Sequence, residues 1–153
     1  MKVSFFSNFL NHHQLPLCLA MINKGVDFTF VATEPVPDER INLGYEKMND
    51  TYDFVLKTYE SNDNYKKALE IAESSDMVII GSASNDFIKK RLELNKITFR
   101  YSERIFKKGK WKLIIPRTRR NLYRAYVKDN DKKIYLLAAS AYATKDFNLI
   151  RSL

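Results

Sequence analysis

The sequence predicts an α/β protein built on a doubly wound parallel sheet. Short apolar runs alternate along the chain with helical patterns, from a run at residues 3–6 to a helix at residues 142–150. The runs are largely continuous, which is typical of parallel strands covered on both faces. Strand and helix units that repeat in this way, joined by right-handed crossovers, place helices on both faces of one sheet. We therefore expect a Rossmann-like domain with six strands.

The first strand and helix are predicted between residues 2 and 25. Proline is tolerated in the first turn of a helix but not in its interior, so Pro16 places the helix start at residues 13–15, and Gly25 ends the helix. The helix has one apolar stripe with i, i+3, i+4 and i+7 spacing, formed by Leu15, Cys18, Leu19 and Ile22.

Two histidines, His12 and His13, are expected at the positive end of this helix. That position favours a neutral imidazole that can accept a proton. The alternative is that they are cap or solvated surface residues. Because the two residues are adjacent on a helix, their rings are expected to point in different directions.

The remaining elements follow in order along the chain. Strands are predicted at residues 27–33, 51–59, 76–81, 97–101 and 134–139, and helices at residues 64–74, 117–128 and 142–150, with one more helix capped by Ser84 or Asn85. The polar connection at residues 34–50 is long for a loop in a compact domain, and such segments are often binding loops.

The composition indicates one globular domain. The 153 residues are 45% hydrophobic and 13% aromatic, enough for a full core. No apolar run approaches the ~20 residues of a bilayer-spanning helix, and polar residues interrupt the N-terminal run where a signal peptide would be apolar. The single cysteine, Cys18, excludes an internal disulfide. These features favour a cytoplasmic setting.

Several kinds of ligand site are excluded by missing motifs. The four glycines build neither G-x-G-x-x-G nor G-x-x-x-x-G-K-S/T, so no loop is suited to a close approach to pyrophosphate. No cysteine and histidine spacing suggests zinc, and no metal site is predicted. Because the G-x-S-x-G elbow is missing too, Ser82 and Ser84 are interpreted as caps rather than nucleophiles.

Three segments stand out by their order and spacing: SFFSNFLNHHQLPLCLAM at residues 4–21, FRYSERIFKKG at residues 99–109 and SAYATKDF at residues 140–147. Together they resemble the N-terminal domain of bacterial glycosyltransferases with the two-domain GT-B fold, which build capsular and other surface polysaccharides. In that family two Rossmann-like domains face each other across a cleft.

This resemblance implies that residues 1–153 are the acceptor-side domain of a glycosyltransferase. It implies that no cofactor binds this domain, that the nucleotide-sugar donor binds a C-terminal domain absent from this chain, and that this chain alone is inactive. The reaction would add a sugar to a growing surface polysaccharide or lipid-linked glycan. The implied partners are a glycan or polyprenyl-linked acceptor, the C-terminal domain, and the inner face of the cell membrane, where the protein would be peripheral.

His13 is the candidate catalytic residue. His13-Gln14-Leu15-Pro16 matches the H-x-x-P spacing that many inverting members carry at this turn, where the histidine acts as general base toward the acceptor hydroxyl. The glycine that often precedes that histidine is replaced here by His12, and retaining members do not need a base at this turn. Both stereochemical outcomes therefore stay open.

The S-E-R string implies further acceptor contacts. Glu103 would bind acceptor hydroxyls and Arg104 an acceptor or donor phosphate; alternatively, the two side chains pair with each other or cap a helix. The other candidate acceptor-binding residues are Asn11, His12, Ser84 and Tyr142.

The charge is unevenly distributed. The chain carries +8, but residues 89–133 hold 17 Lys and Arg against four acids, so this segment carries +13 and the rest −5. Residues 107–115 mix cations, an indole and aliphatic side chains, a composition suited to the water–lipid boundary. The predicted contacts with an anionic membrane surface are Lys107, Lys108, Lys110, Trp111, Arg117, Arg120 and Arg124, of which the three arginines share one helix face.

Three alternatives remain for the basic segment. It could be a merely solvated helix, or the chain could be a stand-alone scaffolding domain of the same fold. A nucleic-acid-binding module would use the charge together with Trp111, Tyr123 and Tyr126 as stacking groups. Nucleic acid is disfavoured as a partner because no recognition motif is present and the rest of the chain is acidic.

Overall fold

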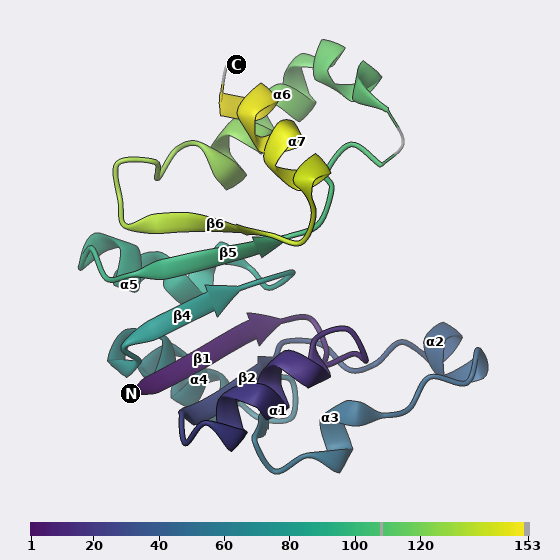
Figure 1. The fold of residues 1–153 in the computed structure, drawn as a ribbon, viewed down its shortest axis with the longest axis vertical. Helices are drawn as coiled ribbons and strands as arrows, with labels where there is room; N and C mark the ends of the chain where they lie inside the picture. Colours follow the sequence, from purple (N-terminus) through teal and green to yellow (C-terminus); the bar gives the residue numbers. More distant parts are fainter. Residues whose placement is uncertain (108, 152–153) are drawn as a thin grey trace.

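The structure, a computed structural model, describes residues 1–107 and 109–151, with Lys112 described by its backbone only. Six parallel strands form one sheet in the order β3-β2-β1-β4-β5-β6, with helices on both faces (Figure 1). The predicted doubly wound α/β fold is confirmed. The strands are β1 (Lys2–Ser7), β2 (Asp27–Ala32), β3 (Val55–Lys57), β4 (Met77–Ile80), β5 (Thr98–Ser102) and β6 (Ile134–Ala138).

The predicted helices lie at or near their expected positions, and further short helical segments lie within the connection at residues 34–50 and in the basic segment. The chain adds β2 and β3 on one side of β1 and then crosses over to add β4, β5 and β6 on the other side. The strand order therefore reverses between β1 and β4. The helical segments are α1 (Leu15–Asn23), α2 (Asp38–Asn42), α3 (Met48–Thr51), α4 (Asn62–Ser74), η1 (Asn85–Ile88), α5 (Lys89–Glu93), η2 (Lys110–Ile114), α6 (Pro116–Tyr126) and α7 (Ala141–Arg151).

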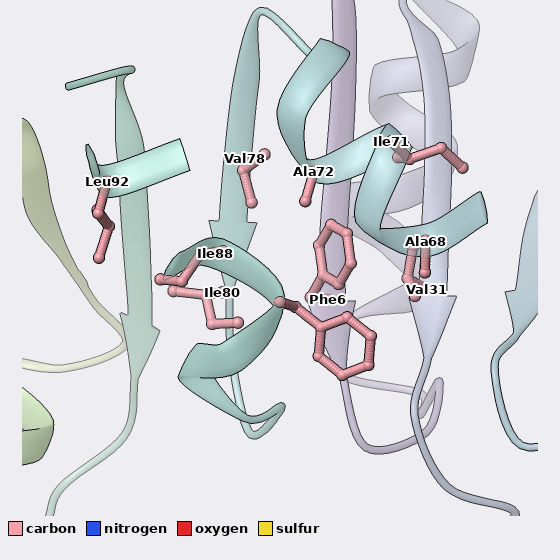
Figure 2. Close-up of a cluster of buried hydrophobic side chains, with 10 residues drawn as sticks. Phe6, Val31, Ala68, Ile71, Ala72, Val78, Ile80, Ile88 and Leu92 are labelled. Atoms are coloured by element: carbon pink, nitrogen blue, oxygen red, sulfur yellow. The ribbon is translucent and has the colours of Figure 1, made fainter. Parts of the chain in front are cut away.

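The sheet separates two hydrophobic cores, and β1 contributes to both because successive strand side chains point to opposite faces. Val3 and Phe5 pack with Cys18 of α1 on the face that is toward the viewer in Figure 1. Phe6 packs on the other face with α4, η1 and α5, whose side chains gather over the strands in Figure 2. Burial on both faces explains why the strands read as apolar runs.

The α1 helix begins at Leu15, with Pro16 in its first turn, as predicted. Leu19, predicted on the buried stripe, is 38% exposed, so that part of the prediction is wrong. Cys18 is fully buried at the centre of the contact with the sheet, and the next residue on a helix is rotated by about 100° from it. Leu19 therefore lies on the flank of the helix.

The connection at residues 34–50 is more ordered than a polar loop, because it contains α2 and α3. The buried side chain of Asn49 holds it in place. Its Oδ1 accepts the backbone N–H of Leu10 at 2.9 Å, and its Nδ2 donates to the carbonyl oxygen of Glu34 at 3.2 Å. The connection is thus fastened to the loop that follows β1.

A buried arginine joins α4, β4 and β5 at the opposite end of the sheet. Arg91 is fully buried and donates to the carbonyl oxygens of Ala72, Ser75, Asp76 and Ile97 and to the hydroxyl of Thr98. Burial lowers the pKa of Arg91, although Asp76 opposes this effect.

Within the described ranges, no helix is both long and apolar enough to cross a bilayer.

Candidate functional site

The candidate site lies at the carboxyl ends of β1, β4 and β5, where the strand order reverses. In open α/β sheets, ligands bind in the crevice outside the strand ends at this point. A cavity of about 510 Å³ is found there, which we call the rim pocket. Its polar and charged lining comes from the loop after β1, the end of β4, β5 with its following loop, and the α2 and α6 helices: Asn8, Asn11, Gln14, Arg40, Ser82, Arg100, Tyr101, Ser102, Glu103, Arg104, Lys107 and Tyr126.

The loop between β1 and α1 forms one wall of the rim pocket. Asn11 Oδ1 accepts the backbone N–H groups of His13 at 3.0 Å and Gln14 at 3.2 Å, which closes the turn before α1. The buried Gln14 amide donates from Nε2 to Ser7 Oγ at 3.2 Å. Its Oε1 is itself buried and has no hydrogen-bond partner among the described residues.

The end of β4 contributes Gly81 to the wall. A Cβ atom at this position would lie 3.2 Å from both Ser7 Oγ and a ring carbon of Phe5. Only glycine lets the two strand ends come this close without displacing a neighbour. Gly81 therefore determines the spacing between β1 and β4 at the pocket.

Glu103 and Arg104, the residues of the S-E-R string, form the third wall. Arg104 Nε lies 3.6 Å from Oδ2 of Asp146, a buried residue of α7 that also accepts the backbone N–H of Phe106 at 2.9 Å. The Arg104 guanidinium lies 5.1 Å from the centre of the Tyr142 ring. The segments at residues 99–109 and 140–147, far apart in sequence, thus meet beside the pocket.

Glu103 forms an ion pair with Lys107. No ion pair joins it to Arg104 within the described part of the chain, so the alternative that the two side chains neutralise each other is wrong. Arg104 takes its carboxylate partner from α7 instead. Both residues keep polar atoms at the pocket wall.

Arg100 is a pocket residue that sequence reasoning missed. It is 8% exposed, and its Nη2 donates to Asn85 Oδ1 at 3.1 Å. The guanidinium lies 5.3 Å from the centre of the Tyr126 ring. Burial lowers the pKa of Arg100, while Tyr126 and Asp129 oppose this effect. The only signal in the sequence was an arginine inside an otherwise buried strand.

The two histidines lie on the same rim of the sheet but outside the pocket wall. Both are exposed, and their rings lie against each other at a tilt of 47° with centres 3.9 Å apart, so the expectation that they point in different directions is wrong. The reason is that they lie in the turn before α1, where helical geometry does not separate neighbours. His12 also lies 5.6 Å from Tyr45, which is itself 5.2 Å from the Arg40 guanidinium.

The other predicted acceptor residues do not line the pocket. Ser84 caps η1, because its Oγ accepts the backbone N–H of Asp86 at 3.2 Å and donates to the Asp86 carboxylate at 2.8 Å. Tyr142 is exposed on α7, where its ring contacts the guanidinium of Arg104 outside the pocket lining. Among the described residues, no group of three His, Cys, Asp or Glu side chains could hold a metal ion.

Exposed apolar and basic residues follow one another along η2 and α6, and we call this set the amphipathic patch: Lys110, Trp111, Ile114, Ile115, Arg117, Arg120 and Arg124. Ile114 is 82% exposed, Trp111 58% and Ile115 41%. The three arginines line one shallow groove on α6, as their spacing predicts. Lys107 belongs to the rim pocket, and Lys108 lies outside the described residues.

Comparisons with models of protein families, with curated proteins and with solved structures find no match to this chain.

Proposed function

We propose that this chain is the acceptor-binding domain of a glycosyltransferase and that the acceptor binds in the rim pocket. The observation that carries the proposal is the convergence of Asn11, Glu103 and Arg104 on one crevice at the reversal of strand order. These residues come from two of the segments that resemble the GT-B enzymes. The pocket is also where an open α/β sheet binds its ligand.

The pocket offers the chemistry that sugar hydroxyls require. A hydroxyl both donates and accepts, so its site needs carbonyl or carboxylate oxygens beside N–H donors. The Glu103 carboxylate supplies acceptors, while Arg104 supplies donors. A purely electrostatic site for nucleic acid would not need this mixture.

His13 would act as the general base toward an acceptor that extends from the pocket. Its exposed ring lies against the neighbouring His12 ring and remains open to a ligand. Because the activity would need the donor-binding domain as well, the test of acceptor binding uses this chain by itself.

The amphipathic patch would place this domain on an anionic membrane surface. Exposed aliphatic and indole side chains beside three arginines suit the lipid headgroup region, where each cation contributes about 1 kcal/mol. The proposed location is therefore peripheral, at the inner face of the cell membrane.

The decisive experiment is a titration of the ¹⁵N-labelled chain with glucose, galactose and N-acetylglucosamine, followed by ¹H–¹⁵N NMR. We expect amide shifts around the rim pocket, and roughly tenfold weaker binding after Glu103→Gln, because each hydrogen bond to a charged group contributes about 1.5–3 kcal/mol. The matched control is Glu70→Gln, an exposed carboxylate on α4. Two results would contradict the proposal: an affinity for sugar that does not change with Glu103→Gln, or amide shift changes that occur only at residues outside the pocket.

A single-stranded oligonucleotide is the second titrant. Tight, sequence-tolerant binding that shifts residues of α6 and leaves the rim pocket unchanged would favour the nucleic-acid-binding alternative. Absence of binding by either class of ligand would favour the scaffolding alternative.

A further inference from the structure

Arg100 is the most unusual charged residue at the rim pocket. The residue is only 8% exposed, yet among the described residues no ion pair joins its guanidinium to a carboxylate. Among the described residues, its side chain contacts the amide oxygen of Asn85 and the face of Tyr126, both neutral. Asp129 acts on it only from a greater distance. A buried charge without an ionic partner is costly to the fold.

The rest of the pocket does not supply the missing anion. Glu103, the acidic side chain in the wall, is already paired with Lys107. Arg104 is already paired with Asp146 of α7, whereas Arg40 adds positive charge to the same wall. The electrostatic balance of the pocket is therefore positive around a guanidinium that has spare donors.

We infer that the rim pocket is an anion site whose receptor is Arg100 and that its ligand carries a phosphate ester. A planar guanidinium binds two phosphate oxygens through parallel N–H donors, and burial strengthens the interaction. This inference deepens the proposed function, and it rests on that function for the sugar part of the ligand. The phosphate could belong to a soluble sugar phosphate or to a lipid-linked glycan.

The test titrates the intact chain with glucose, glucose 1-phosphate, inorganic phosphate and octyl phosphate. We expect the Arg100 Nε–Hε signal to shift with each phosphate, and glucose 1-phosphate to bind at least ~10-fold more tightly than glucose. Tighter binding of octyl phosphate supports a lipid-linked source, and tighter binding of glucose 1-phosphate supports a soluble one.

Arg100→Gln should abolish the preference for phosphate. Arg119→Gln, on the exposed surface of α6 outside the pocket wall, should keep it. If Arg100→Gln does not fold, the test is whether the Arg100 Nε–Hε signal of the unaltered chain shifts when phosphate is added. An unmoved signal, or a folded Arg100→Gln variant that retains the preference, overturns the inference.

The outcomes also separate this inference from the proposed function. Glucose that binds in the pocket as tightly as glucose 1-phosphate overturns the anion site and keeps the acceptor domain. Inorganic phosphate that shifts Arg100, with no gain from an attached sugar, keeps the anion site and counts against a sugar acceptor.

Discussion

Arg91 and Arg100 are both buried arginines without a carboxylate at ion-pair distance among the described residues, but their surroundings differ. Arg91 has five acceptors, four of them backbone carbonyls at the ends of α4, β4 and β5. Arg100 has one, and it borders a cavity. A guanidinium whose donors are used by the backbone holds the fold together, whereas one with spare donors beside a cavity is suited to a ligand.

We therefore expect Arg91→Met to destabilise the protein by at least ~3 kcal/mol, because several buried carbonyls lose their donor and each costs about 1–3 kcal/mol. Urea unfolding followed by circular dichroism measures this. The neighbouring Lys90→Met removes only a surface ion pair with Glu73 and should cost less than ~1 kcal/mol. Equal effects of the two substitutions would contradict the role given to Arg91.

Cys18 makes stability depend on pH. Burial raises the pKa of the Cys18 thiol from 9.0 to about 12, so the folded state holds its proton where the unfolded state has lost it. The contribution is fully present below about pH 9 and is lost as the pH rises toward 12. The stability difference between the parent protein and Cys18→Ala should therefore shrink between about pH 8 and about pH 10.5.

Urea unfolding of both proteins across that pH range measures the difference directly. Lysines and tyrosines titrate in both proteins, so the comparison isolates the thiol. A difference that stays constant with pH would show that the thiol is not protected from ionisation.

At the scale of elements, the end of β4 controls the geometry of the pocket. Gly81→Ala should destabilise the fold by about 1–3 kcal/mol, because the new Cβ meets Ser7 and Phe5 at distances tighter than ordinary contact. Ser7 Oγ accepts a hydrogen bond from the side-chain amide of Gln14, a residue of the pocket wall. Because a displaced Ser7 would move Gln14, sugar binding should weaken as well.

The control for this substitution is Ala83→Gly, two residues further along the same loop. It should leave the pocket amides unchanged in the ¹H–¹⁵N spectrum. Sugar binding by Gly81→Ala at the parental affinity would show that the close approach of β1 and β4 does not matter to the pocket.

At the scale of the whole molecule, the charge asymmetry has a testable consequence. The intact chain should sediment with vesicles of anionic phospholipid at low salt and dissociate at high salt, because exposed charges are screened. Replacing Arg117, Arg120 and Arg124 with glutamine should abolish sedimentation.

The matched control replaces Lys24, Lys66 and Lys67, which are exposed on α4 and after α1, and changes the net charge equally. That control should sediment like the parent protein. Equal binding to neutral vesicles, or equal loss in both triple variants, would contradict a membrane role for the amphipathic patch.

The fold was predictable because its signals are local. Continuous apolar runs follow from burial on both faces, and Pro16 fixed the start of α1 to within a residue or two. The clustering of Asn11, Glu103 and Arg104 could also be predicted from the sequence, because the carboxyl ends of parallel strands meet at one edge of the sheet.

The sequence by itself determined the order of strands and helices, the arginine face of α6 and the buried position of Cys18, since each depends on spacing within one element. Only the tertiary structure decided that Arg104 pairs with Asp146, that the two histidine rings contact each other, and that Arg100 borders the pocket. These contacts join segments distant in sequence or depend on turn geometry. Hydrophobic spacing reports which face a side chain lies on, but not which distant residue the packed chain brings against it.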